Sequence, residues 1–162
     1  MDVATRYYLS PLGWLMLNSE NEFITGVSFV QKPAGESGVS VALEQCQHQL
    51  EAFFEGTLTE FSVPLNAQGT FFQRCVWKAL QTIPFGTRLS YGKLAERIDN
   101  PKACRAVGGA NNRNPIAILI PCHRVVGAHG ELTGYAGGLE RKQALLDHEQ
   151  RVLAGAFTKM NY

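Results

Sequence analysis

The N-terminal part of the chain alternates apolar and polar residues with the two-residue period of β-strands. Three runs rich in aromatic and branched side chains are separated by the turn signals SPLG and SENE, and they lie at 5–9, 14–19 and 23–31. Runs of this kind predict a three-stranded meander.

The pattern then becomes helical. Apolar residues recur at helical spacing over 40–55 and Gly56 stops the run, which predicts one amphipathic helix. The segment 61–65 predicts at most an edge strand, because Pro64 cannot donate to a sheet ladder. Residues 66–69, NAQG, have the composition of a linker.

A second helical region begins at Thr70. Phe72, Val76 and Leu80 lie at i, i+4 and i+8, and they predict a helix that ends before Pro84. These positions place one apolar face toward a core.

Two short helices follow, and their arrangement is similar to a helix-turn-helix. Ser90 caps the first, at 91–98, and Pro101 opens the second, at 102–112. A last amphipathic helix is predicted at 139–149. The elements together predict an α+β chain.

The helix at 102–112 consists almost entirely of small residues. Gly108 and Gly109 each cost a helix about 1 kcal/mol relative to alanine, so another backbone is expected to approach closely. Tight packing against a neighbouring helix would explain this. A helix slim enough for a narrow groove of DNA, with Arg105 projecting from it, would explain it too, and we favour the DNA groove because the charge agrees with it.

Charge is divided unevenly along the chain. Residues 1–70 hold two basic and eight acidic residues, a charge of −6, and residues 71–162 hold thirteen basic and six acidic residues, a charge of +7. Between residues 100 and 130 there is no acid, but there are four basic residues, Lys102, Arg105, Arg113 and Arg124. This asymmetry indicates an anionic partner for the C-terminal half, unless it is only an uneven solvated surface.

Composition is that of an ordinary globular protein, with 45% hydrophobic and 18% charged residues. The N-terminus carries Asp2 and no apolar stretch typical of a secretory signal. No apolar run approaches the ~20 residues of a membrane helix. We therefore expect a cytoplasmic protein that does not bind membranes.

The four cysteines form no C-x-x-C pair, and no histidine completes a zinc spacing, so no metal site is predicted. In a reducing compartment all four are expected to be free thiols. Cys46 and Cys75 lie on apolar helix faces, which predicts a structural role for both.

Cys122 has a different setting, the stretch ILIPCHRVVG at 118–127. A thiol becomes a strong nucleophile as thiolate, and a basic neighbour such as His123 favours that form. Adjacent side chains need not touch, so a buried inert cysteine is the alternative. Because Pro121 holds the residue before it extended, we expect a buried, strand-like segment that presents the thiol at its end.

These residues resemble the active-site signature of the O6-alkylguanine-DNA alkyltransferases. The resemblance extends from about Thr70 to Glu149, in family order and spacing, and it covers the blocks FFQRCVWKALQTIPFGTRLSYGKLA, NPKACRAVGGANNRNPIAILIPCHRVVG and GELTGYAGGLERKQALLDHE. It implies a ribonuclease H-like N-terminal domain at 1–66, with a three-stranded sheet and a helix. It also implies a mostly helical domain at 70–155 with a winged helix-turn-helix-like motif, leaving a tail at 156–162.

The resemblance implies direct reversal of DNA damage without a cofactor. Cys122 would take the alkyl group from O6-alkylguanine, and more weakly from O4-alkylthymine, in one irreversible step. His123 would act through a water as the base that activates Cys122. Glu149 would orient and polarise His123.

Further roles are implied by matching motifs. Asn114 matches the hinge asparagine, Tyr91 the tyrosine that turns out the target nucleotide, and Arg105 the finger that fills the gap in the base stack. Tyr135 matches a wall of the substrate pocket, with Ala136 beside it and the backbone of Val125 and Val126 on the guanine edge. The same match places Lys102, Ala103, Cys104 and Gly108 on the DNA-binding face.

The partner implied is double-stranded DNA that contains O6-alkylguanine. The helix-turn-helix of the family enters the minor groove, which is about 6 Å wide and suits a helix of alanine and glycine. We expect a monomer in solution, and cooperative assembly on DNA stays open. Many relatives carry proline at the position of Ala117 and some carry serine at that of Ala136, so the smaller side chains here predict tolerance of bulkier alkyl groups.

Three other functions compete with this interpretation. A non-catalytic alkyltransferase-like protein would bind the lesion only, but such proteins carry another residue in place of Cys122. A thiol hydrolase leaves the slim basic helix unexplained. A DNA-binding regulator would need more base-reading side chains than Asn111, Asn112 and Arg113 provide.

Overall fold

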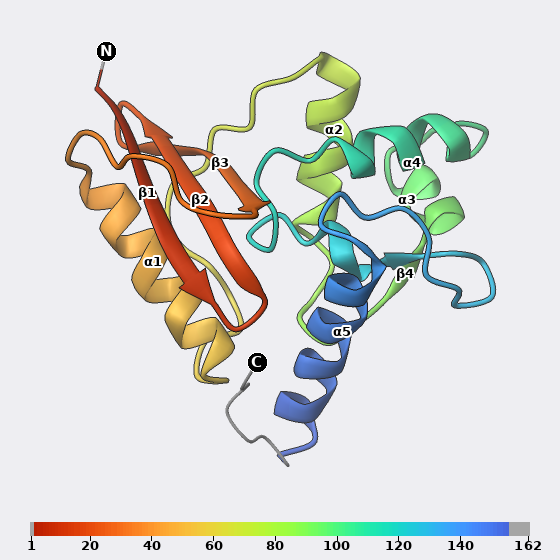
Figure 1. Ribbon diagram of the computed structural model, residues 1–162. Coiled ribbons are helices and arrows are strands. Elements are labelled where there is room, and N and C mark those ends of the chain that lie inside the picture. Colours follow the sequence, from red (N-terminus) through yellow and green to blue (C-terminus); the bar gives the residue numbers. More distant parts are fainter. Residues whose placement is uncertain (1, 156–162) are drawn as a thin grey trace.

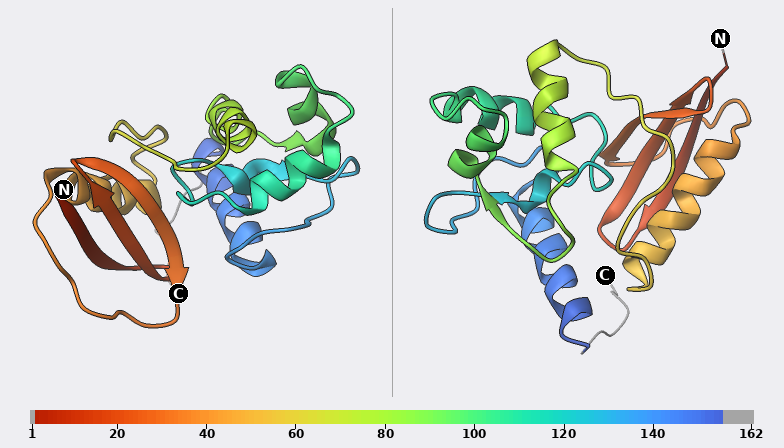
Figure 2. Two further views of the ribbon diagram at one scale, coloured as in Figure 1. Left: turned by 90° about the horizontal axis from the view of Figure 1, so that it is seen from above. Right: turned by 180° about the vertical axis from the view of Figure 1, so that it is seen from behind.

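The computed structural model describes residues 2–155 and places them in two adjoining parts (Figure 1). A sheet and one helix form the N-terminal part, and four helices with short connecting strands form the C-terminal part. Views from above and from behind show the sheet and its helix standing beside the other helices (Figure 2). The tail expected at 156–162 lies outside the described residues.

The predicted meander is confirmed. Its strands are antiparallel in the order β1-β2-β3, with β1 at Val3–Ser10, β2 at Gly13–Glu20 and β3 at Phe23–Val30. Asn21 and Glu22 form the tight turn between β2 and β3 and both have positive φ, as a type I′ hairpin requires. The strands therefore follow from the alternation and from the turn residues.

Helix α1, Val41–Phe54, covers one face of the sheet, as predicted. The Ser40 hydroxyl caps its N-terminus by accepting from the N–H of Leu43. The Glu22 carboxylate accepts from the Ser40 hydroxyl at 2.7 Å and from the first two N–H groups of the helix, where the helix dipole favours a negative charge. Cys46 is fully buried in this core, and burial raises the pKa of its thiol to about 12.

Both edges of the sheet are occupied by irregular chain. On the β1 side, Thr5 exchanges backbone hydrogen bonds with Ser37, and the N–H of Tyr7 donates to the Glu36 carboxylate. On the β3 side, Ile24 pairs with Leu65. The predicted edge strand at 61–65 is thus wrong: only one bridging residue forms, because Pro64 offers a carbonyl but no N–H.

Four helices build the C-terminal part, and the predicted ones are all present. They are α2 at Phe71–Leu80, α3 at Tyr91–Arg97, α4 at Cys104–Asn112 and α5 at Leu139–Leu153. Thr70 and Gln73 form a capping box on α2, and Ser90 caps α3. α4 packs against α2 and α3, and the indole N–H of Trp77 donates to the carbonyl of Ala110 at 2.8 Å.

The two-residue strands β4, Leu89–Ser90, and β5, Val125–Val126, pair in parallel next to α3. Between them in sequence lies a short 3-10 helix, η1, at Cys122–Arg124. No helix within residues 2–155 combines the length and the apolar character needed to cross a membrane.

Candidate active site

Cys122 lies at the wall of a cavity where both parts of the chain meet. The cavity has a volume of about 90 Å³, and its residues come from β3, from the end of α4 and the segment after it, and from the loop before α5. Cys122 itself is 5% exposed. The residues around it are Val27, Ser28, Phe29, Asn112, Asn114, Ala117, Tyr135, Ala136 and Gly137.

The apolar run before Cys122 is buried but is not a strand. Residues 117–119 form turns, and Ile118 has a φ of 72°, which no strand allows. Only Ile116 bridges to the sheet, where it pairs with Val27 of β3. The expected strand-like segment is therefore wrong, and Cys122 begins the 3-10 helix η1.

Asn114 explains how this run can be buried without sheet partners. Its side-chain oxygen accepts from the N–H of Ile116 at 3.0 Å, and its amide nitrogen donates to the carbonyls of Ile116 and Ile120 at 3.3 and 2.8 Å. Buried backbone groups need partners, and one side chain supplies three hydrogen bonds here. Asn114 thereby folds the segment back so that Cys122 faces the cavity.

His123 and Glu149 form a buried pair. His123 Nε2 lies 2.7 Å from Glu149 Oε2, and both residues are 0% exposed. Nε2 is thus assigned the proton, which leaves Nδ1 as the basic nitrogen. His123 Nδ1 has no hydrogen-bond partner in the described part of the chain.

Arg124 binds the same carboxylate as His123. Its guanidinium donates to both oxygens of Glu149 at 2.9 to 3.1 Å and to the carbonyl of Ile83 at 2.8 Å. The N–H of Gly86 also donates to Glu149, at 3.0 Å. Burial opposes the charge on Glu149, but the hydrogen bonds and charges of His123 and Arg124 lower the pKa of this carboxyl to about 2.

Burial favours the neutral form of both the Cys122 thiol and the His123 imidazole. Burial raises the pKa of Cys122, although Asn114 and the charge of Lys142 act in the opposite direction. Burial lowers the pKa of His123, and this outweighs the attraction of Glu149. A neutral imidazole next to a neutral thiol can act as a general base.

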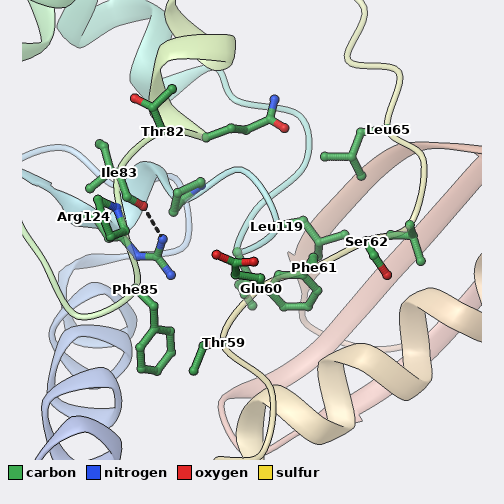
Figure 3. A pocket seen from close by; sticks show the side chains of 15 residues that line it. Thr59, Glu60, Phe61, Ser62, Leu65, Thr82, Ile83, Phe85, Leu119 and Arg124 are labelled. Carbon is green, nitrogen blue, oxygen red and sulfur yellow. Dashed lines mark hydrogen bonds between the residues drawn. The ribbon is translucent and has the colours of Figure 1, made fainter.

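A larger cavity, of about 590 Å³, lies on the far side of Arg124. It separates the chain at 59–65 from the loop at 81–85 and from the residues before Cys122. Arg124 and Ile83 both line it, and Figure 3 shows the hydrogen bond between them. Side chains therefore do not fill the space between the segment at 59–65 and Arg124.

Two family descriptions match consecutive parts of the chain. Residues 3–67 match "6-O-methylguanine DNA methyltransferase, ribonuclease-like domain", and residues 71–151 match "6-O-methylguanine DNA methyltransferase, DNA binding domain". The chain belongs to the 6-O-methylguanine DNA methyltransferase family.

Individual relatives are similar over most of their length. The methylated-DNA–protein-cysteine methyltransferase of Mycolicibacterium paratuberculosis is 50% identical over 147 residues, 88% of this chain and 89% of that protein. The protein of the same name from Methanosarcina acetivorans is 47% identical, over 86% of this chain and 94% of its own. The crystal structure of Mycobacterium tuberculosis OGT in complex with DNA matches with a TM-score of 0.85 at 47% identity, over 91% and 93% of the two chains. The predicted family and α+β fold are confirmed.

The chain brings two of its four expected pocket residues to the Cys122 cavity. Tyr135 and Ala136 line the Cys122 cavity, and so does Asn114. Val125 and Val126 are not among the residues that line this cavity; both are buried in β5, which pairs with β4. Tyr91 lies half-buried, and its hydroxyl donates to the carbonyl of Thr133 in the loop before α5.

The residues expected on a DNA face cluster at the start of α4. Lys102, Cys104 and Arg105 are exposed, and Ala103 is half-buried. A Cβ on Gly108 would touch the Tyr91 ring at an ordinary 3.8 Å, and a Cβ on Gly109 would meet open space. Packing inside the protein therefore requires glycine at neither position.

Two residues of the site do not follow from the sequence. Arg124 is one of the basic residues that indicate an anionic partner, but in the structure it binds Glu149. The other is Lys142, which is fully buried and donates to the carbonyl of Thr133 at 2.8 Å. A signal was present: Lys142, Leu145, Leu146 and Glu149 share one face of α5 at i, i+3, i+4 and i+7.

Proposed function

We propose that this protein repairs DNA by moving the alkyl group of O6-alkylguanine, and more weakly that of O4-alkylthymine, to the Sγ of its own Cys122. The observation that carries the proposal is the buried His123–Glu149 hydrogen bond of 2.7 Å next to a buried thiol. No cofactor enters the reaction. Each molecule reacts once, because no group in the proposed scheme cleaves the resulting thioether.

The proposed step balances as follows. His123 Nδ1 takes the thiol proton, through one bridging water, and becomes a cation held by Glu149. The thiolate forms a bond to the alkyl carbon as the bond from that carbon to O6 breaks. The electron pair of the broken bond stays on O6, and the proton taken from the thiol returns from the His123 imidazolium to the base, so that unmodified guanine remains in the DNA. The negative charge of Glu149 stabilises the imidazolium that forms midway.

The substrate base must leave the helix before it can react. A stacked base is out of reach of a buried thiol, so it has to be flipped at a cost of a few kcal/mol. Ligand pockets usually measure about 300–1,000 Å³, and the Cys122 cavity is much smaller at about 90 Å³. We infer that the loop carrying Tyr135 and Ala136 moves when a base enters.

The DNA face is assigned to the start of α4. Arg105 would enter the base stack, and Lys102 would contact phosphate. Phosphate contacts bind without reading sequence, which suits damage that arises in any sequence. Gly108 and Gly109 of α4, where internal packing does not require glycine, would let its backbone approach a minor groove. A monomer supplies all of these groups, and cooperative assembly on DNA is a separate property.

A mass spectrum tests the proposal. The protein is mixed with a duplex that carries one O6-methylguanine, digested, and the peptide containing Cys122 is weighed. We expect one added methyl group per molecule, absent in Cys122→Ala and retained in Cys75→Ala, which removes a half-buried thiol of α2 instead. Binding of the duplex with an unmodified Cys122 peptide would instead identify a lesion-binding protein without transfer activity.

A further inference from the structure

His148 connects the helix that carries Glu149 to the N-terminal domain. Its Nε2 lies 2.7 Å from the carbonyl oxygen of Phe53, in the last turn of α1. The imidazole also packs against the rings of Phe53 and Phe54, with centroids 5.0 and 6.1 Å apart. His148 is 0% exposed, so this contact is a buried one between the two domains.

A second contact lies two turns earlier on the same helix. Arg141 donates from Nε to the carbonyl of Leu12 at 2.9 Å, and its guanidinium lies 4.4 Å from the centroid of the Phe29 ring. Residues seven apart lie on one face of a helix. The N-terminal domain therefore contacts one face of α5 at two positions, about two turns apart along the helix.

Near Arg124 the link to the N-terminal domain is less direct: the rings of Phe53 and Phe85 pack with centroids 6.0 Å apart, and the Arg124 guanidinium lies 5.6 Å from the Phe85 centroid. The 590 Å³ cavity occupies that region, between the chain at 59–65 and Arg124 (Figure 3). The hydrogen bonds from Arg124 and Gly86 reach the carboxylate of Glu149 but do not tie its helix to the N-terminal domain.

We propose that His148 is a positioning residue for alkyl transfer: by anchoring α5 to Phe53, it sets the place of Glu149 relative to His123. The inference rests on the proposed function, because it assigns His148 an effect on that reaction. His148 directly precedes Glu149, so a shift of the anchor moves the carboxylate with it. The contact between His148 and Phe53 thereby lets the N-terminal domain affect the reaction, although that domain contributes neither the nucleophile nor the base.

The effect is expected to be partial. Gln150 donates to the carbonyl of Gly86 at 2.7 Å and holds α5 from within the C-terminal domain. A misplacement of about 1 Å in a reacting constellation can cost about 100-fold in rate. Because Gln150 still holds α5, His148→Leu is expected to slow methyl transfer by only roughly 10-fold.

The test measures the single-turnover rate of methyl transfer from an O6-methylguanine duplex at saturating protein. His48→Leu is the matched control, because it removes an exposed histidine from α1. We expect a slower rate in His148→Leu with unchanged duplex affinity, and wild-type values in His48→Leu. His148→Gln, whose amide can reach the Phe53 carbonyl, should recover most of the rate, whereas His148→Asn is too short and should not.

A double-mutant comparison separates positioning from general damage. In a Glu149→Gln background the carboxylate is gone, so adding His148→Leu should change the rate less than about twofold. An equal loss in both backgrounds would overturn the proposal, as would a wild-type rate in His148→Leu. If His148→Leu does not fold, the transfer rates of His148→Gln and His148→Asn are compared instead. A faster rate in His148→Gln supports the proposal, and equal rates overturn it. If the wild-type protein itself transfers no methyl group, the proposed function fails rather than this inference.

Discussion

Tyr91 and Lys142 donate to the same acceptor. The Tyr91 hydroxyl and the Lys142 ammonium lie 2.9 and 2.8 Å from the carbonyl oxygen of Thr133. Tyr91 begins α3 and Lys142 belongs to α5, so the loop between β5 and α5 is held from two sides. If Tyr91 turns toward DNA, Lys142 still holds the loop, and with it the Tyr135 wall of the cavity.

Removing the Lys142 charge should make Cys122 less reactive. The ammonium lowers the pKa of Cys122 against the effect of burial, so Lys142→Met should raise that pKa further. A shift of one unit lowers the thiolate fraction about tenfold. Iodoacetamide labelling of the Cys122 peptide at pH 7 should slow accordingly, and Lys93→Met, an exposed charge on α3, should label like the wild type.

The same lysine gives the labelling rate a second pH dependence. Burial lowers the pKa of Lys142 to about 8, so its charge is lost as the pH rises through 8. Wild type and Lys142→Met should therefore label at converging rates above that pH. A constant ratio from pH 6 to pH 9 would contradict this role.

Glu149 should make stability depend on pH in the acid range. The pKa of its carboxyl is about 2 in the folded protein and lies below the ordinary value of 4.5. The unfolded chain therefore binds the proton first, and the stabilisation present above pH 4.5 is lost as the pH falls toward 2. From pH 7 to pH 3 the wild type should lose about 2 kcal/mol more than Glu149→Gln.

Urea unfolding at both pH values measures this difference. Because other carboxylates titrate in both proteins, only the difference between the two variants is informative. Equal losses in wild type and Glu149→Gln would show that the pKa of Glu149 is not lower in the folded protein than in the unfolded chain.

Asn114→Ala should destabilise the whole protein. The substitution removes three hydrogen bonds that satisfy buried backbone groups around Ile118. We expect a loss of about 2–3 kcal/mol in the free energy of unfolding, together with slower methyl transfer. Thermal and urea unfolding measure it, with the exposed Asn100→Ala as control. An unchanged unfolding midpoint would show that the backbone finds other partners.

The small residues at the cavity should govern which alkyl groups react. Ala136 lines the cavity and is exposed, so Ala136→Leu should narrow the entrance without disturbing the core. A few methylene groups in a pocket change selectivity by roughly 10-fold or more. The rate ratio of benzyl to methyl transfer should fall by that amount, while Ala128→Leu, outside the cavity, should leave the ratio unchanged.

Local signals explain what could be predicted from the sequence. Alternation and turn residues predict β1 to β3, and caps such as Ser40, Thr70 and Ser90 predict where helices begin. These signals act over a few residues. Cys122 and His123 were found because a motif places them side by side.

Tertiary contacts explain what could not be predicted. The run before Cys122 is as apolar as a buried strand, but a single side chain, Asn114, folds it into turns. Arg124 and Lys142 carry the charges of surface residues, and only the packed structure shows one paired with Glu149 and the other enclosed beside Thr133. The role proposed for His148 likewise depends on its contact with Phe53, which lies 95 residues earlier.

The two occupied edges of the sheet have a consequence for the behaviour of the protein at high concentration. A free edge strand offers a row of N–H and C=O groups to which another molecule can add a strand. Here Ser37 and Glu36 take that place along β1, and Leu65 and Ile116 take it along β3. A small sheet with both margins blocked is a poor template for intermolecular β-pairing. The bridge at Ile116 therefore occupies part of the β3 edge with the same residues that lead the chain to its reactive thiol.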